Sequence, residues 1–252
     1  MERRYNAPAM MTSDSDDLFD RPDAPVRPFE FDADVARVFP DMVRRSVPGY
    51  AELIGCAGLI ARRLVRPGTN CYDLGCSLGA VSRAILRQVT GEVQLIAVDN
   101  APAMIEGLRA RCADIPGAER LQPLCADVRA VPIEDASLVV LNLTLQFVPP
   151  DERLALLERI RAGLVPGGAL LLAEKIRVPD DPGGALLTAL HEDFKRANGY
   201  SELAIARKRA ALEQVLVPDT LEVHEQRLHQ AGFAGQVRWF QNLSFVAWLA
   251  WT

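Results

Sequence analysis

The chain carries apolar residues at two different spacings, and the change between them predicts where helices and strands lie. In residues 35–64, apolar positions recur three or four apart, which predicts an N-terminal helix around 35–43 and a second helix over 51–64. Pro40 is expected to bend or split the first of these helices. From residue 70 onward, short apolar runs alternate with amphipathic stretches, and this predicts strands that alternate with helices.

The alternating part of the chain predicts an α/β fold. Strands are expected over 70–74, 92–98, 120–125, 137–143 and 169–173. Helices are expected over 79–89, from an N-cap at Asn100 to about 112, and from an N-cap at Asp151 to about 164. Strand–helix–strand units of this kind have right-handed crossovers, so we expect a doubly wound, mostly parallel sheet.

The C-terminal third departs from this pattern in two places. Residues 180–217 are charged and helical in character but do not repeat the unit, so we interpret them as a helical insertion that serves as a lid or an interface. After a helix over 220–231, apolar stretches at 236–240 and 243–249 are separated only by Gln241 and Asn242, which predicts an antiparallel hairpin. The hairpin brings the expected sheet to seven strands and distinguishes it from a plain dinucleotide-binding fold.

The composition is typical of a soluble globular protein. The 252 residues suffice for one large core, and contents of 49% apolar and 24% charged residues are ordinary. Residues 1–28 are polar and proline-rich without a continuous apolar segment, so we interpret them as a flexible leader rather than a signal peptide, and 29–252 as a single domain. No apolar run approaches the roughly 18 residues of a membrane span.

Charge and cysteine content narrow the function further. The formal net charge of −5 argues against a surface built to bind nucleic acid directly. The five cysteines form no C-x-x-C pair, which gives no support for a zinc site or a disulfide framework and suits a reducing cytoplasm. His191, His224 and His229 lie beside no serine or cysteine in a nucleophile arrangement. We therefore expect a cytoplasmic protein with a small-molecule ligand and no metal.

The stretch CYDLGCSLG, residues 71–79, is the first candidate for a binding site. An acidic residue ends an apolar strand there, and Gly75 and Gly79 allow a sharp turn into a helix whose free N–H groups face a ligand. No Lys-Ser or Lys-Thr follows to bind a nucleoside triphosphate. Because ligands of such sheets bind beyond the carboxyl ends of the strands, the ends of the following strands matter as much as the turn.

Those strand ends carry residues that suit an adenosine. Asp99 can accept hydrogen bonds from two ribose hydroxyls, although it can also cap the following helix. Asp127 and Val128 offer an acceptor and an apolar contact to adenine, or they form a surface turn. Asn142 lies in an apolar run, where a buried amide needs a partner, and Asp73 can orient the glycine turn. Together these residues predict an adenosine-type ligand.

Two levels of resemblance to known families accompany this pattern. The set DLGCSLG, VDN, CADV, SLVVLNLTLQF and LVPGGALLLAEK, with the C-terminal hairpin, resembles the class I S-adenosylmethionine-dependent methyltransferases. The stretches VFPDMVRRSVPGY (38–50), YDLGCSLGA (72–80), DFKRANGYSEL (193–203) and RKRAALEQVL (207–216) closely resemble the carboxy-S-adenosyl-L-methionine synthase family. This resemblance runs over about residues 31–248, and the leader departs from it.

The closer resemblance implies a reaction and an assembly. In that family, S-adenosylmethionine and prephenate give carboxy-S-adenosyl-L-methionine and phenylpyruvate. The product is the cofactor for 5-oxyacetyl uridine formation at the tRNA wobble position. The resemblance further implies a homodimer without a metal, which acts on small molecules and contacts neither nucleic acid nor membrane directly.

The resemblance also implies roles for individual residues. It places Gly75, Cys76 and Ser77 in the turn that lines the nucleoside, Asp99 and Asn100 at the ribose, Asp127 and Val128 at the adenine, and Asn142 beneath the sulfonium. It assigns Tyr50 and Arg209 to the charged end of the ligand, with Tyr200 nearby, and these three are the expected catalytic residues. In a homodimer, Arg209 can act across the interface from a partner subunit.

The role of Arg209 also has a physical argument. A guanidinium near the positive sulfonium is repelled by roughly 4 kcal/mol at about 4 Å and an effective dielectric of about 20. A carboxylate added to the methyl group reverses this penalty, since arginine pairs with carboxylates bidentately. Lys195 and Arg196 offer further positive charge for a dicarboxylate such as prephenate. The alternatives are a solvated helix face for RKR (207–209) and local pairing of Lys195 and Arg196 with acidic neighbours.

Three rival functions remain open from the sequence. A conventional S-adenosylmethionine-dependent methyltransferase of a small molecule or RNA would transfer a methyl group without prephenate. An NAD-dependent oxidoreductase fits Asp99, but the hairpin and the missing third glycine of the turn count against it. A non-catalytic S-adenosylmethionine-binding protein would be expected to lose Asp73, Gly75 or Asp99, and all three are present.

Overall fold

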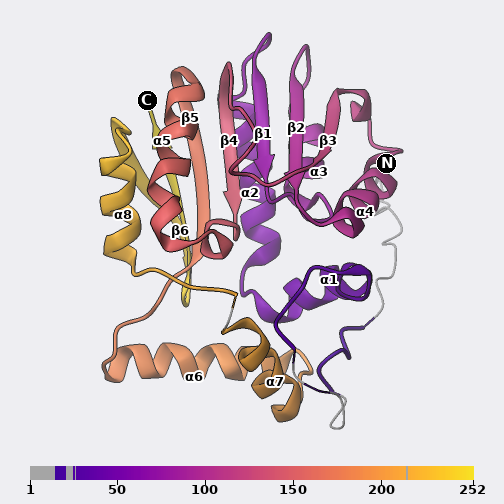
Figure 1. The fold of residues 1–252 in the computed structure, drawn as a ribbon, viewed down its shortest axis with the longest axis vertical. Helices are drawn as coiled ribbons and strands as arrows, with labels where there is room; N and C mark the ends of the chain where they lie inside the picture. Colours follow the sequence, from indigo (N-terminus) through magenta and orange to yellow (C-terminus); the bar gives the residue numbers. More distant parts are fainter. Residues whose placement is uncertain (1–14, 21–24, 26, 214) are drawn as a thin grey trace, which may run out of the picture.

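A seven-stranded sheet with helices on both faces organises the chain (Figure 1). The computed structural model describes residues 15–20, 25, 27–213 and 215–252. The strands lie in the order β3-β2-β1-β4-β5-β7-β6. They are β1 (Asn70–Leu74), β2 (Gln94–Asp99), β3 (Leu121–Cys125), β4 (Ala136–Asn142), β5 (Leu164–Lys175), β6 (Gly235–Asn242) and β7 (Phe245–Trp251).

Eight α-helices and three short 3₁₀ turns connect these strands within the described residues. The helices are α1 (Ala33–Ser46), α2 (Tyr50–Leu64), α3 (Ala80–Gln88), α4 (Pro102–Cys112), α5 (Arg153–Gly163), α6 (Pro182–Ala197), α7 (Glu202–Leu212) and α8 (Leu221–Gln230). The turns are η1 (Ala118–Arg120), η2 (Leu145–Phe147) and η3 (Pro150–Glu152). In the part of the chain that the structure describes, no helix is both long and apolar enough to cross a bilayer.

The pairing of the strands confirms the predicted fold class. Strands β1 to β5 pair in parallel, whereas β7 runs antiparallel to both β5 and β6. The strand order changes direction between β1 and β4, because β1 continues through β2 to β3 on one side and β4 leads to β5 on the other. In doubly wound sheets this switch point is where ligands bind, so the carboxyl ends of β1 and β4 are the place to look for a site.

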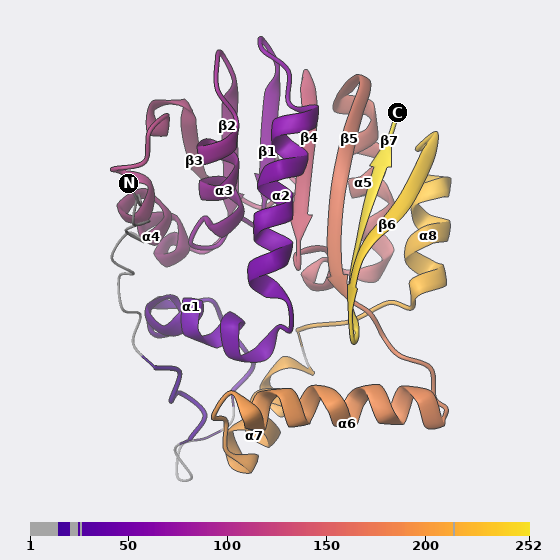
Figure 2. The same cartoon turned by 180° about the vertical axis from the view of Figure 1, so that it is seen from behind.

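Alternate residues of the strands pack into two separate apolar clusters, one on each face of the sheet. Cys71 and Leu95 pack with helices α2, α3 and α4, which cover one face (Figure 2). Tyr72 and Leu74 pack with α5 and α8 on the other face. Strand β4 is buried on both faces, which explains why its sequence is apolar without alternation.

Helices α1, α6 and α7 form a further layer beyond the carboxyl ends of the parallel strands (Figures 1 and 2). The prediction that residues 180–217 are helical is confirmed, since α6 and α7 lie there. Ser201 begins α7 as an N-cap, and its hydroxyl accepts the Ala204 N–H at 3.0 Å. This layer brings α1 and α7 over the strand ends, where a ligand of the sheet would lie.

Several local predictions differ from the structure. Pro40 does not split the first helix, because Val35, Val38 and Met42 on one face of α1 are buried together and tertiary packing holds the helix through the proline. Asn100 is not the N-cap of α4. The N-cap position is Ala101, and its N–H is bound by the carboxylate of Asp99.

Two other boundaries are shifted. The proline-led turn η3 contains Asp151, so α5 begins only at Arg153 with Glu152 as its N-cap residue. The hairpin turn lies at 243–244 rather than 241–242, because Asn242 still pairs with Phe245. Leu243 takes a left-handed conformation there, with φ of 50°, where a glycine or asparagine signal would ordinarily mark the turn.

The prediction of a flexible leader is wrong for residues 15–20. Asp16 is buried, with 2% of its surface exposed, and its backbone N–H donates to the Asp41 carboxylate at 2.9 Å. Leu18 and Phe19 pack against a third apolar cluster, where the Phe19 ring stacks on Phe29. The sequence pattern hid this contact because only two apolar residues make it. The prediction for 1–14, 21–24 and 26 lies outside the described residues.

Candidate active site

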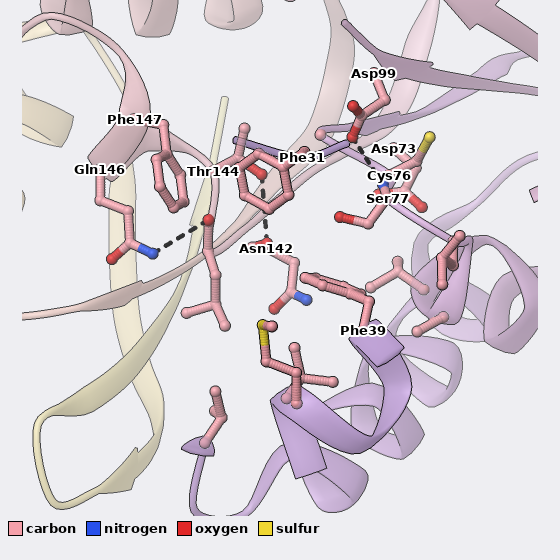
Figure 3. A pocket seen from close by; sticks show the side chains of 18 of the residues that line it. Phe31, Phe39, Asp73, Cys76, Ser77, Asp99, Asn142, Thr144, Gln146 and Phe147 are labelled. Carbon is pink, nitrogen blue, oxygen red and sulfur yellow. Dashed lines mark hydrogen bonds between the residues drawn. The ribbon is translucent and has the colours of Figure 1, made fainter. Parts of the chain in front are cut away.

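A pocket of about 430 Å³ lies at the switch point, between the strand ends and helix α1 (Figure 3). Eight of the predicted nucleoside-contacting residues line it. They are Gly75, Cys76, Ser77, Asp99, Asn100, Asp127, Val128 and Asn142. The predicted catalytic Tyr50 lines it as well. Residues predicted from separate strands are thus brought together around one cavity.

The glycine turn between β1 and α3 is tightly bound to the neighbouring strand. The backbone N–H groups of Gly75 and Cys76 both donate to the carbonyl of Val98, at 2.8 and 2.9 Å. Gly75 has φ of 79°, and a Cβ on it would overlap the side chain of Thr144. The turn therefore requires glycine for its conformation and for the close approach of the Thr144 loop.

Asp99 caps the following helix and also lines the pocket. One carboxylate oxygen accepts the Ser77 N–H at 2.9 Å, and the other accepts the Ala101 N–H at 3.0 Å. Burial raises the pKa of Asp99, and these two backbone donors oppose that rise. Each oxygen has a second lone pair, so Asp99 can cap α4 and still accept hydroxyl groups of a ligand in the pocket.

Asp73 contacts the helix that follows the glycine turn. Its carboxylate is fully buried and accepts the Ser82 hydroxyl at 2.6 Å, which ties β1 to helix α3. Burial raises the pKa of Asp73 to about 6. Asp73 therefore orients the turn through the helix that follows it.

Asp127 lines the pocket with its carboxylate already paired. Arg129 binds it through both Nε and the backbone N–H, and the same guanidinium pairs with Glu152 at 2.8 Å. The hydrogen bonds from Arg129 hold the pKa of Asp127 below its usual range. The carboxylate is consequently ionised and fixed, and Val128 beside it supplies an apolar wall.

Asn142, the last residue of β4, carries the clearest sign of an unmet partner. Its side-chain oxygen Oδ1 is buried without a hydrogen bond to any described residue, and the side chain faces the pocket. A buried amide oxygen without a donor costs about 1–3 kcal/mol, so native proteins rarely leave one unpaired. A ligand donor, or a cationic centre, would satisfy it.

The loop after Asn142 is held by a residue that the sequence analysis missed. The Glu174 carboxylate, with no exposed surface, accepts the N–H groups of Thr144, Leu145 and Gln146 at 3.1, 2.7 and 2.9 Å. Burial raises the pKa of Glu174 to about 8, against the effect of these donors. A lone acidic residue in the apolar run of β5 was the available signal.

Aromatic rings cover part of the pocket, and the sequence gave no reason to single them out. Phe31 packs edge-on against Phe147, with ring centroids 5.4 Å apart, and against Phe39 at 6.1 Å. Figure 3 shows Phe31 and Phe39 beside Asn142. Faces and edges of aromatic rings suit a cationic ligand group, and their bulk excludes water.

Two of the three residues predicted to be catalytic, Tyr200 and Arg209, lie outside the pocket of their own chain. Tyr200 does not line the pocket but lies behind it, where its hydroxyl bonds to the Asp16 carboxylate and accepts from Lys208 Nζ at 3.1 Å. Arg209 does not line the pocket of its own chain either. It is half exposed and pairs with Glu192 of α6. Lys208, its neighbour in the sequence, is buried and lines the pocket instead.

The alternative for Arg196 is confirmed. Its guanidinium pairs with Glu192, Asp193 and Glu202 on the outer side of α6 and α7. Lys195, one residue earlier, forms no such pair with a described residue. Of the two predicted cations near GYSEL, only Lys195 is therefore without an acidic partner among the described residues.

Comparison with known proteins identifies the fold class. Residues 72–168 match the family model for a methyltransferase domain. A putative O-methyltransferase from Nostoc punctiforme superposes with a TM-score of 0.62 at 16% identity, over 87% of this chain and 59% of that one. Human N-acetylserotonin methyltransferase, solved with SAM, gives 0.58 at 18% identity, over 87% and 55%. Both comparisons show a methyltransferase-type fold.

Comparison with curated relatives then identifies the family. The carboxy-S-adenosyl-L-methionine synthase of Stutzerimonas stutzeri (strain A1501) is 52% identical over 95% of this chain and 99% of its own length. The synthase of Geobacter sp. (strain M21) is 47% identical over the same shares of the two chains. The chain belongs to the carboxy-S-adenosyl-L-methionine synthase family. The predicted fold class and family are confirmed.

Proposed function

We propose that the protein transfers a carboxyl group from prephenate to S-adenosyl-L-methionine, giving carboxy-S-adenosyl-L-methionine and phenylpyruvate. The product would supply the cofactor for 5-oxyacetyl uridine formation at the tRNA wobble position, in the cytoplasm. The relatives named as synthases of this product, about half identical over nearly the whole chain, support the reaction. The main structural support for the proposal is the switch-point pocket, which is lined by the residues predicted to contact the nucleoside.

The pocket suits S-adenosyl-L-methionine along its length. Asp99 would accept the ribose hydroxyls, and Asp127 with Val128 would meet the adenine. The unpaired oxygen of Asn142 and the ring of Phe31 would stabilise the sulfonium, because both present negative electrostatic potential to a cation. Backbone and side-chain hydrogen bonds already hold Asp99 and Asp127 in place, which lowers the ordering entropy that opposes binding.

The proposed reaction depends on how the protein positions the two substrates more than on acid–base side chains. Prephenate loses carbon dioxide and hydroxide as its ring becomes aromatic in phenylpyruvate. The hydroxide removes a proton from the sulfonium methyl to give water and an ylide, and the ylide carbon bonds to the carbon dioxide. Every atom is accounted for without a catalytic base from the chain. The phenylalanine cover of the pocket would keep carbon dioxide close and bulk water out.

We further propose that Arg209 contributes to the site of a partner subunit. Its half-exposed guanidinium lies outside the pocket of its own chain but on a surface layer, α7, that another subunit can contact. There it would disfavour the bare sulfonium and pair with the new carboxylate, as the charges require. Tyr50, at the start of α2 in the pocket, would meet the charged end of the ligand within one chain.

A mass measurement tests the proposal against conventional methyl transfer, the reaction that the methyltransferase domain also permits. The purified protein is incubated with S-adenosyl-L-methionine, with and without prephenate. We expect a nucleoside product heavier by one carbon dioxide, and phenylpyruvate beside it, only when prephenate is present. Turnover to S-adenosyl-homocysteine that needs an added methyl acceptor and ignores prephenate would contradict the proposal.

A further inference from the structure

Two lysines near residues of the pocket wall, one on β5 and one on α6, have no acidic partners among the described residues. Lys175 is the last residue of β5, and Lys195 lies near the end of α6. Both are half-buried, and neither forms an ion pair with a described residue. Two partly desolvated ammonium groups without counter-charges are unusual in a folded protein.

The neighbours of these lysines show that they converge. Lys175 pairs in register with Phe245 of β7, and the Phe245 ring packs edge-on against His191, with centroids 5.2 Å apart. His191 lies one helical turn before Lys195 on the same face of α6. Its ring Nε2 donates to the Ser46 carbonyl at 2.8 Å.

Ser46 in turn connects this face of α6 to the pocket. Lys208 Nζ donates to the Ser46 hydroxyl at 3.0 Å, and both residues line the cavity. On the other side, the Lys175 N–H donates to Gln146 Oε1 at 3.3 Å, and Gln146 also lines the cavity. The backbone of Lys175 therefore contacts the cavity wall through Gln146, and α6 contacts it through His191 and Ser46.

The electrostatic coupling within the cluster agrees with this geometry. Burial lowers the pKa of Lys195 to about 8, with the nearby charges of Lys175 and Lys208 adding to the effect. Burial, Lys195, Lys175 and Arg209 likewise lower the pKa of His191 to about 3, so its imidazole is neutral.

The charges of the cluster leave a net positive balance. Lys208 is paired with Asp16 at 3.3 Å, and Arg209 with Glu192. His191 is neutral, so Lys175 and Lys195 are the two charges without a partner among the described residues. A ligand with two negative charges would balance them.

We propose that Lys175 and Lys195 form a subsite for an organic dicarboxylate, the second substrate, beside the nucleoside pocket. Each ammonium pairs with one carboxylate, and Lys208, held by Asp16, limits how far the ligand enters the cavity. The subsite rests on the proposed function for the identity of its ligand as prephenate. Its recognition of a dianion is independent of that function.

The first test separates the two substrates kinetically. Lys195→Gln and Lys175→Gln are each expected to raise the KM for prephenate about tenfold, the loss of one charge-assisted pair, while the KM for S-adenosyl-L-methionine changes less than about twofold. Lys195→Arg keeps the charge and should recover most of the affinity. Arg196→Gln is the matched control, because it removes a cation from the next position on the outer face of α6.

Equal KM values for prephenate in Lys195→Gln and Arg196→Gln would overturn the subsite. So would a parallel rise of both KM values, which would show a general structural effect.

A second test does not depend on the reaction. Malonate, a dicarboxylate that cannot decarboxylate to an aromatic product, is titrated calorimetrically into the wild type and the variants, with acetate as the monoanion. We expect saturable malonate binding that Lys175→Gln weakens about tenfold and Arg196→Gln leaves unchanged. Malonate binding without any carboxylated nucleoside product would support the subsite while contradicting the proposed function. Carboxylated product without malonate binding, or with equal malonate binding in all variants, would support the proposed function and contradict the subsite.

Discussion

The carboxylate of Asp99 accepts the backbone N–H of Ser77 at 2.9 Å, so the end of β2 and the glycine turn after β1 are held together by one side chain. The other oxygen of Asp99 binds the Ala101 N–H at 3.0 Å. Asp99→Asn replaces one oxygen by an NH₂ group that cannot accept, so one of the two N–H groups loses its partner. We expect the affinity for S-adenosyl-L-methionine to fall by roughly 1–3 kcal/mol, measured by calorimetry.

The control for this change is Asp151→Asn, which makes the same substitution at an exposed position of η3 away from the pocket. It should bind S-adenosyl-L-methionine as the wild type does. If Asp99→Asn bound equally well, Asp99 would be a helix cap and nothing more.

Gly75→Ala tests the close packing of the turn against the Thr144 loop. Gly68 provides a control, because its φ of 75° resembles the 79° of Gly75 but a Cβ there meets nothing within 4 Å. Gly68→Ala should cost only the left-handed backbone strain, about 1–2 kcal/mol of unfolding free energy. Gly75→Ala adds an overlap with Thr144, so we expect a further loss in denaturant unfolding and no measurable binding of S-adenosyl-L-methionine. Matching losses in the two variants would show that the loop yields to the extra methyl group.

His224 predicts a dependence of stability on pH. Its ring packs against Trp248 with both nitrogens buried and without partners among the described residues, and burial lowers its pKa to about 4. The unfolded chain binds a proton below its ordinary pKa of about 6.5, and the folded chain does not, so this group lowers stability as the pH falls through that window. The loss reaches about 2 kcal/mol at about pH 5.

The change that isolates this effect is His224→Phe, which fills the same space without titrating. Between about pH 7 and pH 5, the unfolding free energy of this variant should fall by about 2 kcal/mol less than that of the wild type. Buried carboxyl groups such as Glu174 contribute equally to both proteins and cancel in the difference. His229→Phe changes an exposed position on the same helix and should leave the wild-type pH dependence in place. Parallel curves for His224→Phe and the wild type would rule out the buried neutral histidine.

Arg209→Ala should abolish the carboxylated product while leaving the fold intact, because the half-exposed guanidinium is not part of the pocket of its own chain. The affinity for S-adenosyl-L-methionine should not fall, because the guanidinium repels the sulfonium. Action across a dimer has a distinctive consequence. A mixture of Arg209→Ala and Asp99→Asn chains would contain heterodimers with one site in which Asp99 and the facing Arg209 are both intact. At an S-adenosyl-L-methionine concentration too low to saturate Asp99→Asn, product formation by the mixture should therefore exceed the sum of the two variants measured alone. Mixtures no more active than their components would place Arg209 within its own subunit or outside catalysis.

Pocket-lining residues that belong to a local motif were predictable, and residues that act through tertiary contacts were not. Gly75 follows β1, and Asp99 and Asn142 end β2 and β4. Parallel strands bring their carboxyl ends to one edge of the sheet, so residues at successive strand ends lie close together in the fold. Glu174 and Asp16 carry no such signal. Each is an acidic side chain whose meaning depends on donors from distant segments.

The same distinction explains the outcome at α7. The run RKR predicts a solvated helix face by composition, yet Lys208 points into the pocket and Arg209 out of it. Adjacent residues on a helix point about 100° apart, so the direction of each side chain depends on how α7 packs against α1 and α6, which no local pattern specifies.

In the proposed reaction the new carboxyl group comes from prephenate, and isotopic labelling follows that carbon directly. Prephenate labelled with ¹³C in the ring carboxylate is incubated with the protein and S-adenosyl-L-methionine, and the nucleoside product is weighed by mass spectrometry. We predict a carboxylated nucleoside that carries the heavy carbon. A methylated acceptor in place of this nucleoside, or a carboxyl group without the label, would contradict the account.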